Sequence, residues 1–271
     1  LMKAVQKHVS EKWILLYIGR WLKVPYQTSD GRVVERTMGV PQGSVIGPVL
    51  ANLFLTYVFD KWMAKYFPTI PFERYADDTI CHCRTERQAQ YLQACLVKRF
   101  EECGLRLNEE KTKIVYCKDS NRKGNSEHTS FDFLGYTFRP RAARNSKTGQ
   151  NFTAFTPAMS KKSFMKIKTA IRSWNLNRQT HLSIEQIAER INPIVSGWMT
   201  YYSRFGKSEF WKVTSYLNER LSRWVKRKYK RFYKKLGKAY DWLVEFAAHN
   251  RQMFSHWACG YIPYPRRYKL T

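Results

Sequence analysis

Two adjacent aspartates, Asp77 and Asp78, lie between two short apolar segments that predict β-strands. Residues 72–83 therefore predict a strand, a tight turn and a second strand. A largely apolar, buried helix is predicted before them over residues 49–67, and a helix with one apolar face follows and ends at Gly104. Helices flanking a mainly antiparallel sheet define the α+β class, which we predict for the first part of the chain.

Other short segments extend the same pattern. Residues 113–116 and 131–138 predict further strands, and Asp30-Gly31 predicts a two-residue hairpin turn. The polar segment 139–156 carries loop signals and leads into a second part that predicts almost only helices. We therefore expect a boundary between two parts near residue 158.

The chain is strongly basic. It carries 48 Lys and Arg against 21 Asp and Glu, a formal net charge of +27. Residues 160–271 hold 24 of the cations and 6 of the anions, so the excess is concentrated there. Such a charge favours a polyanionic partner, and nucleic acid is the leading candidate because neutralised phosphates release counterions. A generally basic surface without a specific partner is the alternative.

No apolar run approaches the roughly 18 residues that a membrane-spanning helix needs, so no membrane is expected among the partners. Six cysteines occur without a paired C-x-x-C arrangement. Cys81-His82-Cys83 has no second pair of zinc ligands at a useful distance. Reduced thiols in a cytosol-like compartment are the simpler account, and the cytoplasm of a bacterium is the expected location.

The aspartate pair suits metal-dependent chemistry. Nucleotidyl transfer uses two Mg²⁺ ions about 3.5–4 Å apart to activate a 3′-hydroxyl and to stabilise the leaving pyrophosphate. Magnesium prefers hard oxygen ligands and keeps several waters, so a few carboxylates suffice. The alternative is an ordinary solvated turn, where Asp is common. The aspartate pair alone does not distinguish a metal site from a solvated turn, so the residues around it decide.

Tyr75-Ala76-Asp77-Asp78 is similar to the palm motif of reverse transcriptases. Three further blocks resemble that family in the family's order and at similar spacing: residues 39–55 around Pro41-Gln42-Gly43, residues 104–112 and residues 133–136. The resemblance implies a polymerase palm, an antiparallel sheet flanked by helices, followed by an all-α part.

The resemblance also implies a role for each matching residue. Asp77 and Asp78 are expected to be catalytic and to bind Mg²⁺, with two ions in the complete active site. Substrate contacts are expected from a wider set of residues: Tyr75, Ala76, Pro41, Gln42, Gly43, Asn108 and Lys111. Phe133, Leu134 and Gly135 are expected to grip the primer end.

The residues themselves leave alternatives open. Pro41-Gln42-Gly43 predicts a rigid turn with a side-chain amide for contacts, and its glycine lets a ligand approach the backbone. Lys111 is a mobile cation that suits a triphosphate, but a solvated lysine at a strand end has the same sequence signature. Gly135 is either a point of close approach or a β-bulge glycine.

The palm of this family uses a third carboxylate, on a strand before the helix that precedes the Pro-Gln-Gly block. Asp30 and Asp60 are the only aspartates before Asp77, and neither has the expected strand setting. Residues 1–5 resemble the helix that follows the missing strand. We therefore expect that this chain lacks the first catalytic Asp and the finger region, and that it polymerises poorly by itself.

The helical part resembles a second family. Asn192-Pro193, Gly197-Trp198 and Tyr201-Tyr202 are similar to the signature of the group II intron maturase domain. The resemblance implies three domains: an incomplete palm over residues 1–157, a helical thumb over 158–190 and a maturase RNA-binding domain over 191–271.

Basic side chains in these helices are the candidates for RNA contact: Lys161, Lys162, Lys166, Arg223, Lys226, Arg227, Lys230, Arg231 and Lys234. Residues 217–236 predict one basic helix with an apolar stripe. Trp224 and Tyr233 are candidates for stacking on bases, with burial in the core as the alternative.

Together these resemblances imply an RNA-directed DNA polymerase that binds its group II intron RNA and assists splicing and retrohoming. Its partners would be that RNA, an RNA template with a DNA primer, dNTPs and target DNA, with Mg²⁺ as cofactor. The alternative is a non-catalytic RNA-binding splicing cofactor. A primer-dependent RNA polymerase is a weaker reading, since its palm usually carries Gly-Asp-Asp.

Overall fold

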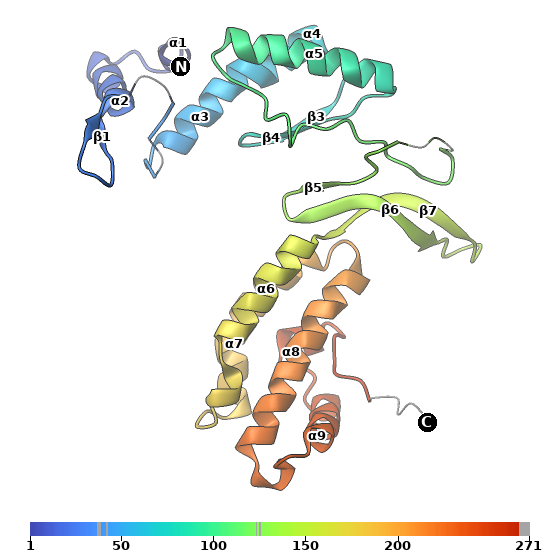
Figure 1. Ribbon diagram of the computed structural model, residues 1–271. Coiled ribbons are helices and arrows are strands. Elements are labelled where there is room, and N and C mark those ends of the chain that lie inside the picture. The colour runs from blue at the N-terminus through green and yellow to red at the C-terminus, as the bar shows by residue number, and fades with distance from the viewer. Residues whose placement is uncertain (37–38, 42, 123, 125, 266–271) are drawn as a thin grey trace. The chain divides into compact units, whose positions relative to one another are not determined.

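The computed structural model describes residues 1–36, 39–41, 43–122, 124 and 126–265 (Figure 1). Contacts between residues divide the chain into two compact units, Leu1–Ile114 and Val115–Thr271. Both helices and small antiparallel sheets occur, so the α+β class is confirmed. No helix of the described residues is long and apolar enough to cross a membrane. The predicted domain borders stay predictions.

The first unit contains helices and two β-hairpins. Strand β1 pairs with β2, and β3 pairs with β4, both antiparallel. The elements in chain order are α1 (Met2–Val5), α2 (Lys12–Lys23), β1 (Tyr26–Gln27), β2 (Val33–Val34), α3 (Gly47–Leu55), η1 (Thr56–Asp60), α4 (Lys61–Tyr66), β3 (Phe72–Tyr75), β4 (Asp78–Cys81) and α5 (Glu86–Glu102).

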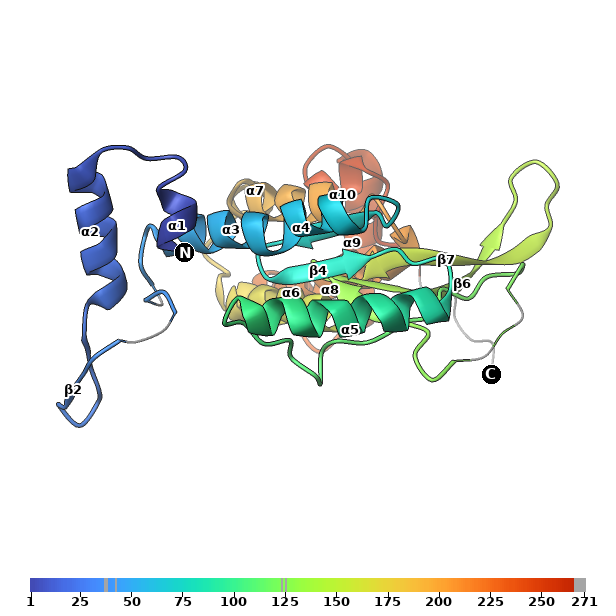
Figure 2. The ribbon, with the colours of Figure 1, turned by 90° about the horizontal axis from the view of Figure 1, so that it is seen from above.

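The predicted helix over residues 49–67 is present, but its middle is not α-helical. Helices α3 and α4 are joined by η1, a π-helical segment. Phe59 and Met63 are fully buried against Leu92 of α5 and against β3 and β4. Figure 1 shows α4 and α5 on one side of the β3–β4 hairpin, and Figure 2, seen from that side, shows both helices running along β4. The prediction that most faces of this helix are buried was wrong at its start, where Val49 is 65% exposed.

The second unit joins a three-stranded sheet, ordered β5-β6-β7, to a bundle of helices. Helices α6 and α8 contact each other, and α9 packs on α8 (Figure 1). The elements are β5 (Phe131–Phe133), β6 (Tyr136–Arg144), β7 (Asn151–Met159), α6 (Lys161–Ser173), η2 (Leu176–Arg178), α7 (Ile184–Tyr202), α8 (Lys207–Lys228), η3 (Lys230–Phe232), α9 (Leu236–His249) and α10 (Ser255–Ala258).

Two predictions about strands were wrong. Residues 113–116 form no strand, and the supposed loop 139–156 is most of a long hairpin in which β6 and β7 pair from Tyr136↔Met159 to Arg144↔Asn151. The loop signals belong only to its tip, where the Asn145 carbonyl accepts from Gly149 N–H at 2.9 Å. The strand signal is weak because β6 contains Pro140 and three arginines, residue types that a strand prediction does not favour.

The single basic helix predicted over residues 217–236 is also wrong. Helix α8 ends at Lys228, Tyr229 is extended, and the short helix η3 precedes α9, which begins at Leu236. Leu217, Leu221 and Phe232 are buried in the same core as residues of α9. Apolar spacing alone does not distinguish one long helix from two helices packed on a shared core.

A buried polar network closes the second unit. Asn218 Oδ1 accepts hydrogen bonds from Trp257 Nε1 and His256 Nε2, each at 2.9 Å, and Asn218 Nδ2 donates to the Tyr261 carbonyl at 3.3 Å. Because indole nitrogen only donates, Trp257 fixes the orientation of the Asn218 amide, and His256 must also donate through Nε2. The network therefore links α8 to α10 and to the chain beyond it.

Candidate active site and nucleic-acid surface

The aspartate pair lies at the hairpin of β3 and β4, as predicted. Tyr75 pairs with Asp78 across the strands, so Ala76 and Asp77 form a two-residue turn. Ala76 has φ +54°, a backbone region that non-glycine residues enter at a cost of about 1–3 kcal/mol. Asp77 and Asp78 are both exposed, and Tyr75 is 64% exposed. The turn thus presents two carboxylates to solvent from a strained backbone.

The residue before the motif holds this turn. Arg74 Nη1 donates to the Ala76 carbonyl at 2.9 Å, and its Nε and Nη2 donate to the two carboxylate oxygens of Asp60 at 2.7 and 2.5 Å. The hydrogen bonds to Asp60 raise the pKa of Arg74. From the sequence, Asp60 was weighed only as the third carboxylate and was rejected for lack of a strand setting; in the structure it is the ion-pair partner of Arg74.

The donor set suits a hard cation. Asp77 and Asp78 offer exposed carboxylate oxygens, and Mg²⁺ is commonly held by one or two carboxylates with substrate phosphates and waters. Within the described ranges, no group of three His, Cys, Asp or Glu is placed to hold a metal. Burial raises the pKa of the Cys81 thiol to about 12, which disfavours a thiolate ligand at Cys81-His82-Cys83.

Other predicted substrate residues of the first unit lie in loops. Gln42 is outside the described residues, while Pro41 is partly buried and Gly43 has φ +83°. Asn108 Oδ1 accepts from the Lys111 backbone N–H at 3.1 Å, so the asparagine shapes the turn that leads to an exposed Lys111. Their substrate roles stay predictions.

The predicted primer-grip residues form another two-residue turn. Phe133 pairs with Tyr136, and the turn residues Leu134 and Gly135 have φ +48° and +80°. Tyr201 Oη donates to the Leu134 carbonyl at 2.7 Å, and Ser163 Oγ donates to the Gly135 carbonyl at 2.9 Å. Gly135 is thus a turn residue and not a β-bulge. The sequence marked Tyr201 only as part of the maturase signature, without this contact.

We expect Gly135→Ala to destabilise the second unit by about 2–3 kcal/mol, since a Cβ there would lie 2.9 Å from both Ser163 Oγ and Tyr202 Oη at a φ that disfavours alanine. Urea unfolding measures the change. Gly149→Ala is the control for φ alone, because its nearest side-chain atom would be 3.6 Å away. Equal losses in both variants would mean that close packing at Gly135 contributes nothing.

The basic residues predicted for RNA contact are at the surface. Lys161, Lys162 and Lys166 are exposed on α6, while Ser163 and Ile167 of the same helix are buried. Lys230, Arg231 and Lys234 are exposed between α8 and α9. Of the two stacking candidates, Trp224 is wrong, because it is fully buried and donates to the Gln179 carbonyl at 3.0 Å. Tyr233 is 69% exposed.

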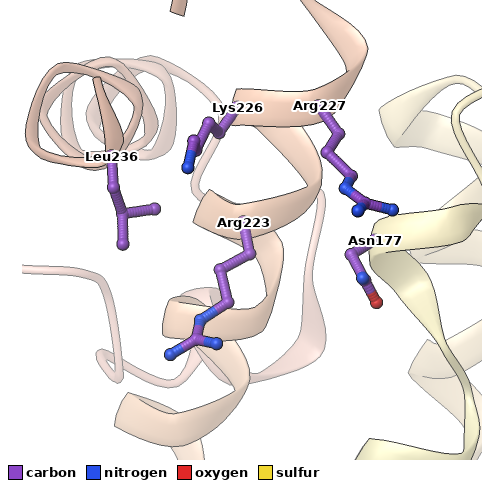
Figure 3. Close-up of a pocket in the computed structure, with 5 residues that line it drawn as sticks. All are labelled: Asn177, Arg223, Lys226, Arg227 and Leu236. Atoms are coloured by element: carbon purple, nitrogen blue, oxygen red, sulfur yellow. The ribbon is translucent and has the colours of Figure 1, made fainter. Parts of the chain in front are cut away.

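The other three cations meet at one cavity. Arg223, Lys226 and Arg227 of α8 line a space of about 300 Å³ with Asn177 of η2 and Leu236 of α9 (Figure 3). Arg223 pairs with Glu219 at 2.6 Å, whereas no ion pair is found for Lys226 or Arg227 within the described part of the chain. Uncompensated positive charge around a concave surface favours an anionic ligand.

Comparison with known families agrees with this geometry. The family model "Reverse transcriptase (RNA-dependent DNA polymerase)" matches residues 1–138, which include both strands of the aspartate hairpin. The chain belongs to the reverse transcriptase family. The family model "Group II intron, maturase-specific domain" matches residues 164–240, so this reverse transcriptase is of the group II intron maturase kind.

Two curated relatives are similar over part of their length. A protein named for intron 1 of COX1/OXI3 in Saccharomyces cerevisiae is 30% identical over 66 residues, which cover 24% of this chain and 8% of the relative. Protein YkfC of Escherichia coli is 25% identical over 183 residues, which cover 53% of this chain and 43% of YkfC. The chain thus spans less than half of either relative.

Proposed function

We propose that the protein is an RNA-directed DNA polymerase that also binds its group II intron RNA and assists splicing and retrohoming. The observation that carries the proposal is the pair of exposed carboxylates, Asp77 and Asp78, at a strained turn within the segment that matches the reverse transcriptase family. In this proposal residues 1–157 supply the palm, and the helices after Met159 supply the thumb and the maturase domain.

The proposed mechanism assigns the Asp77 and Asp78 carboxylates to metal binding beside the primer end. Mg²⁺ bound there would supply the positive charge that activates the 3′-hydroxyl and stabilises the pyrophosphate. Exposed Tyr75 offers a flat surface to the incoming nucleotide, and Lys111 offers a cation to its phosphates. The Leu134-Gly135 turn, fixed by Tyr201 and Ser163, would hold the primer strand.

The proposed RNA surface is formed by the exposed cations of α6 and by the cavity at Arg223, Lys226 and Arg227. The cavity's volume of about 300 Å³ suits a phosphate together with its sugar. Leu236 supplies an apolar wall, and the Asn177 amide supplies a hydrogen-bonding group. Backbone contacts of this kind give affinity that depends on salt and little on sequence.

Arg227→Gln should weaken RNA binding and reduce the slope of log K against log salt by about one, the change expected for one lost phosphate contact. Filter binding of an intron RNA at several salt concentrations measures the slope. Lys212→Gln is the matched control, since it removes one charge from the same helix but from a lysine already paired with Glu209 at 2.5 Å. An equal effect of both substitutions would mean that Arg227 contributes only to the net charge of the protein and makes no specific phosphate contact in the cavity.

A non-catalytic splicing cofactor is the second candidate function. The observation in its favour is that, among the residues the structure describes, no third carboxylate joins Asp77 and Asp78. Such a protein would bind intron RNA and promote splicing without any need for the aspartate pair. The two candidates are therefore separated by substitution of that pair in the full-length protein.

A further inference from the structure

Strand β3 turns an arginine inward. Phe72 and Arg74 are partly buried, whereas Glu73 and Tyr75 are exposed, so alternate side chains face the helices. Phe72 packs on Phe59 with ring centroids 5.0 Å apart. The Arg74 side chain is only 10% exposed. Inward-facing positions of a strand usually hold apolar side chains. A charged group at such a position needs hydrogen-bond partners for all of its donors.

Arg74 has that full set. A guanidinium group carries five N–H donors in a fixed planar fork. In addition to its bonds to Asp60 and to the Ala76 carbonyl, Nη1 donates to Asn52 Oδ1 at 2.9 Å and Nη2 to Thr56 Oγ1 at 3.4 Å. Every donor therefore has a partner, and all partners but one belong to a single helical segment.

The π-helical segment η1 explains how one helix supplies three partners. Asn52, Thr56 and Asp60 are spaced four residues apart. In an unbroken α-helix each such step rotates the side chain by about 40° around the axis, so the third would drift away from the first. The wider π-helical turn, with hydrogen bonds from i to i+5, rotates less per residue and offsets this drift over Thr56–Asp60. The three polar groups consequently face Arg74 together.

The remaining N–H of Arg74 reaches the turn. It donates to the carbonyl of Ala76, the residue with φ +54° immediately before Asp77. We propose that Arg74, clamped by Asp60 and Asn52, is a positioning residue that fixes the turn and thereby the carboxylates of Asp77 and Asp78. This rests on the proposed function, which makes those carboxylates metal ligands. The clamp acts through the backbone and contacts neither carboxylate.

The test compares Arg74→Lys with wild type in the full-length protein during primer extension on an RNA template. Lysine keeps the charge but lacks the fork, so it cannot bridge Asp60, Asn52 and Ala76 together. We expect kcat to fall on the order of 100-fold, since small misplacements of reacting groups have effects of that size. The Mg²⁺ concentration for half-maximal rate should rise severalfold, whereas the KM for primer–template should change little.

Arg99→Lys is the matched control. Arg99 also joins another element to η1, through Nε to the Val58 carbonyl at 3.1 Å, but it makes no contact with the turn. Its replacement should lower thermal stability without raising the Mg²⁺ requirement. If Arg74→Lys is too unstable to assay, Asn52→Ala removes one acceptor without removing charge and should lower kcat about tenfold.

The outcomes separate the two proposals. The positioning role would be overturned if folded Arg74→Lys had the kcat and Mg²⁺ dependence of wild type. If Arg74→Lys does not fold, the same result in Asn52→Ala would overturn it. A matching rise of the Mg²⁺ requirement in Arg99→Lys would overturn it too, by making the effect one of general stability. Wild-type protein that extends no primer at any Mg²⁺ concentration would instead refute the proposed polymerase function.

Discussion

Replacing Asp77 and Asp78 together by alanine should abolish DNA synthesis by the full-length protein and leave its binding to intron RNA unchanged. Both side chains are exposed, so their removal should alter the free energy of unfolding by less than about 0.5 kcal/mol. The loss of both metal ligands should lower the rate of primer extension on the order of a thousandfold or more. Primer extension, RNA affinity and splicing are measured on the same preparation.

Glu73→Gln is the control for this experiment, because it removes a carboxylate from the same hairpin on a side chain that pairs with His82. Retained splicing with lost DNA synthesis would establish two separable activities. Primer extension that survives the double substitution would mean that the pair does not hold the catalytic metal. Splicing assistance by a wild type that makes no DNA would favour the cofactor function.

The second large effect concerns His256, which is completely buried. Burial lowers its pKa from 6.5 to about 3. Its Nε2–H donates to Asn218, and its Nδ1 has no hydrogen-bond partner among the described residues. Protonation would place an unpaired N–H and a charge in the core, so the folded state keeps the ring neutral.

The sign of the pH effect follows from this shift. Below pH 6.5 this histidine is protonated in the unfolded chain, whereas in the folded chain it stays neutral down to about pH 3. The free energy of unfolding therefore decreases as the pH falls from 6.5 towards 3. Between pH 6.5 and about 4.5 the loss from this group should be about 2 kcal/mol. Urea unfolding at the two pH values measures it.

His256→Gln isolates that contribution. Glutamine can still donate to Asn218 Oδ1 but does not titrate, so the variant should lose much less stability on acidification than wild type. His249→Gln controls for removal of a histidine, because the His249 ring lies at the surface. A pH dependence of stability equal to wild type in His256→Gln would show that the acid sensitivity arises elsewhere.

Much of the aspartate hairpin could be predicted from the sequence. Apolar strands on both sides of an acidic pair, with a largely apolar helix before them and a helix with one apolar face after them, predict the observed β3–β4 turn beside α4 and α5 because each pattern is local. The part of the chain after residue 158 was predicted as helical for the same reason. The buried positions Leu217 and Leu221 also follow from helical spacing.

Tertiary contacts account for what was missed. The pairing of strand β7 with β6 depends on register across a nine-residue ladder that no local pattern reveals. The role of Asp60 depends on a π-helical segment and on Arg74, fourteen residues later. The only hint in the sequence was that Arg74 alternates with Phe72 on the side of the strand that faces the helices. Trp224 looked like a stacking residue because sequence does not distinguish a buried indole from an exposed one.

The bond from Tyr201 to the Leu134 carbonyl bears on how such proteins can be recombined. Tyr136 Oη also donates to the Tyr201 carbonyl, so the β5–β6 hairpin and helix α7 are joined by hydrogen bonds in both directions. A chimera whose crossover falls between Met159 and Lys161 would combine a turn from one parent with tyrosines from another. A crossover near residue 115, where the first unit ends, takes the hairpin and the tyrosines from the same parent. We therefore expect residues 131–202 to be exchangeable between such proteins only as one segment.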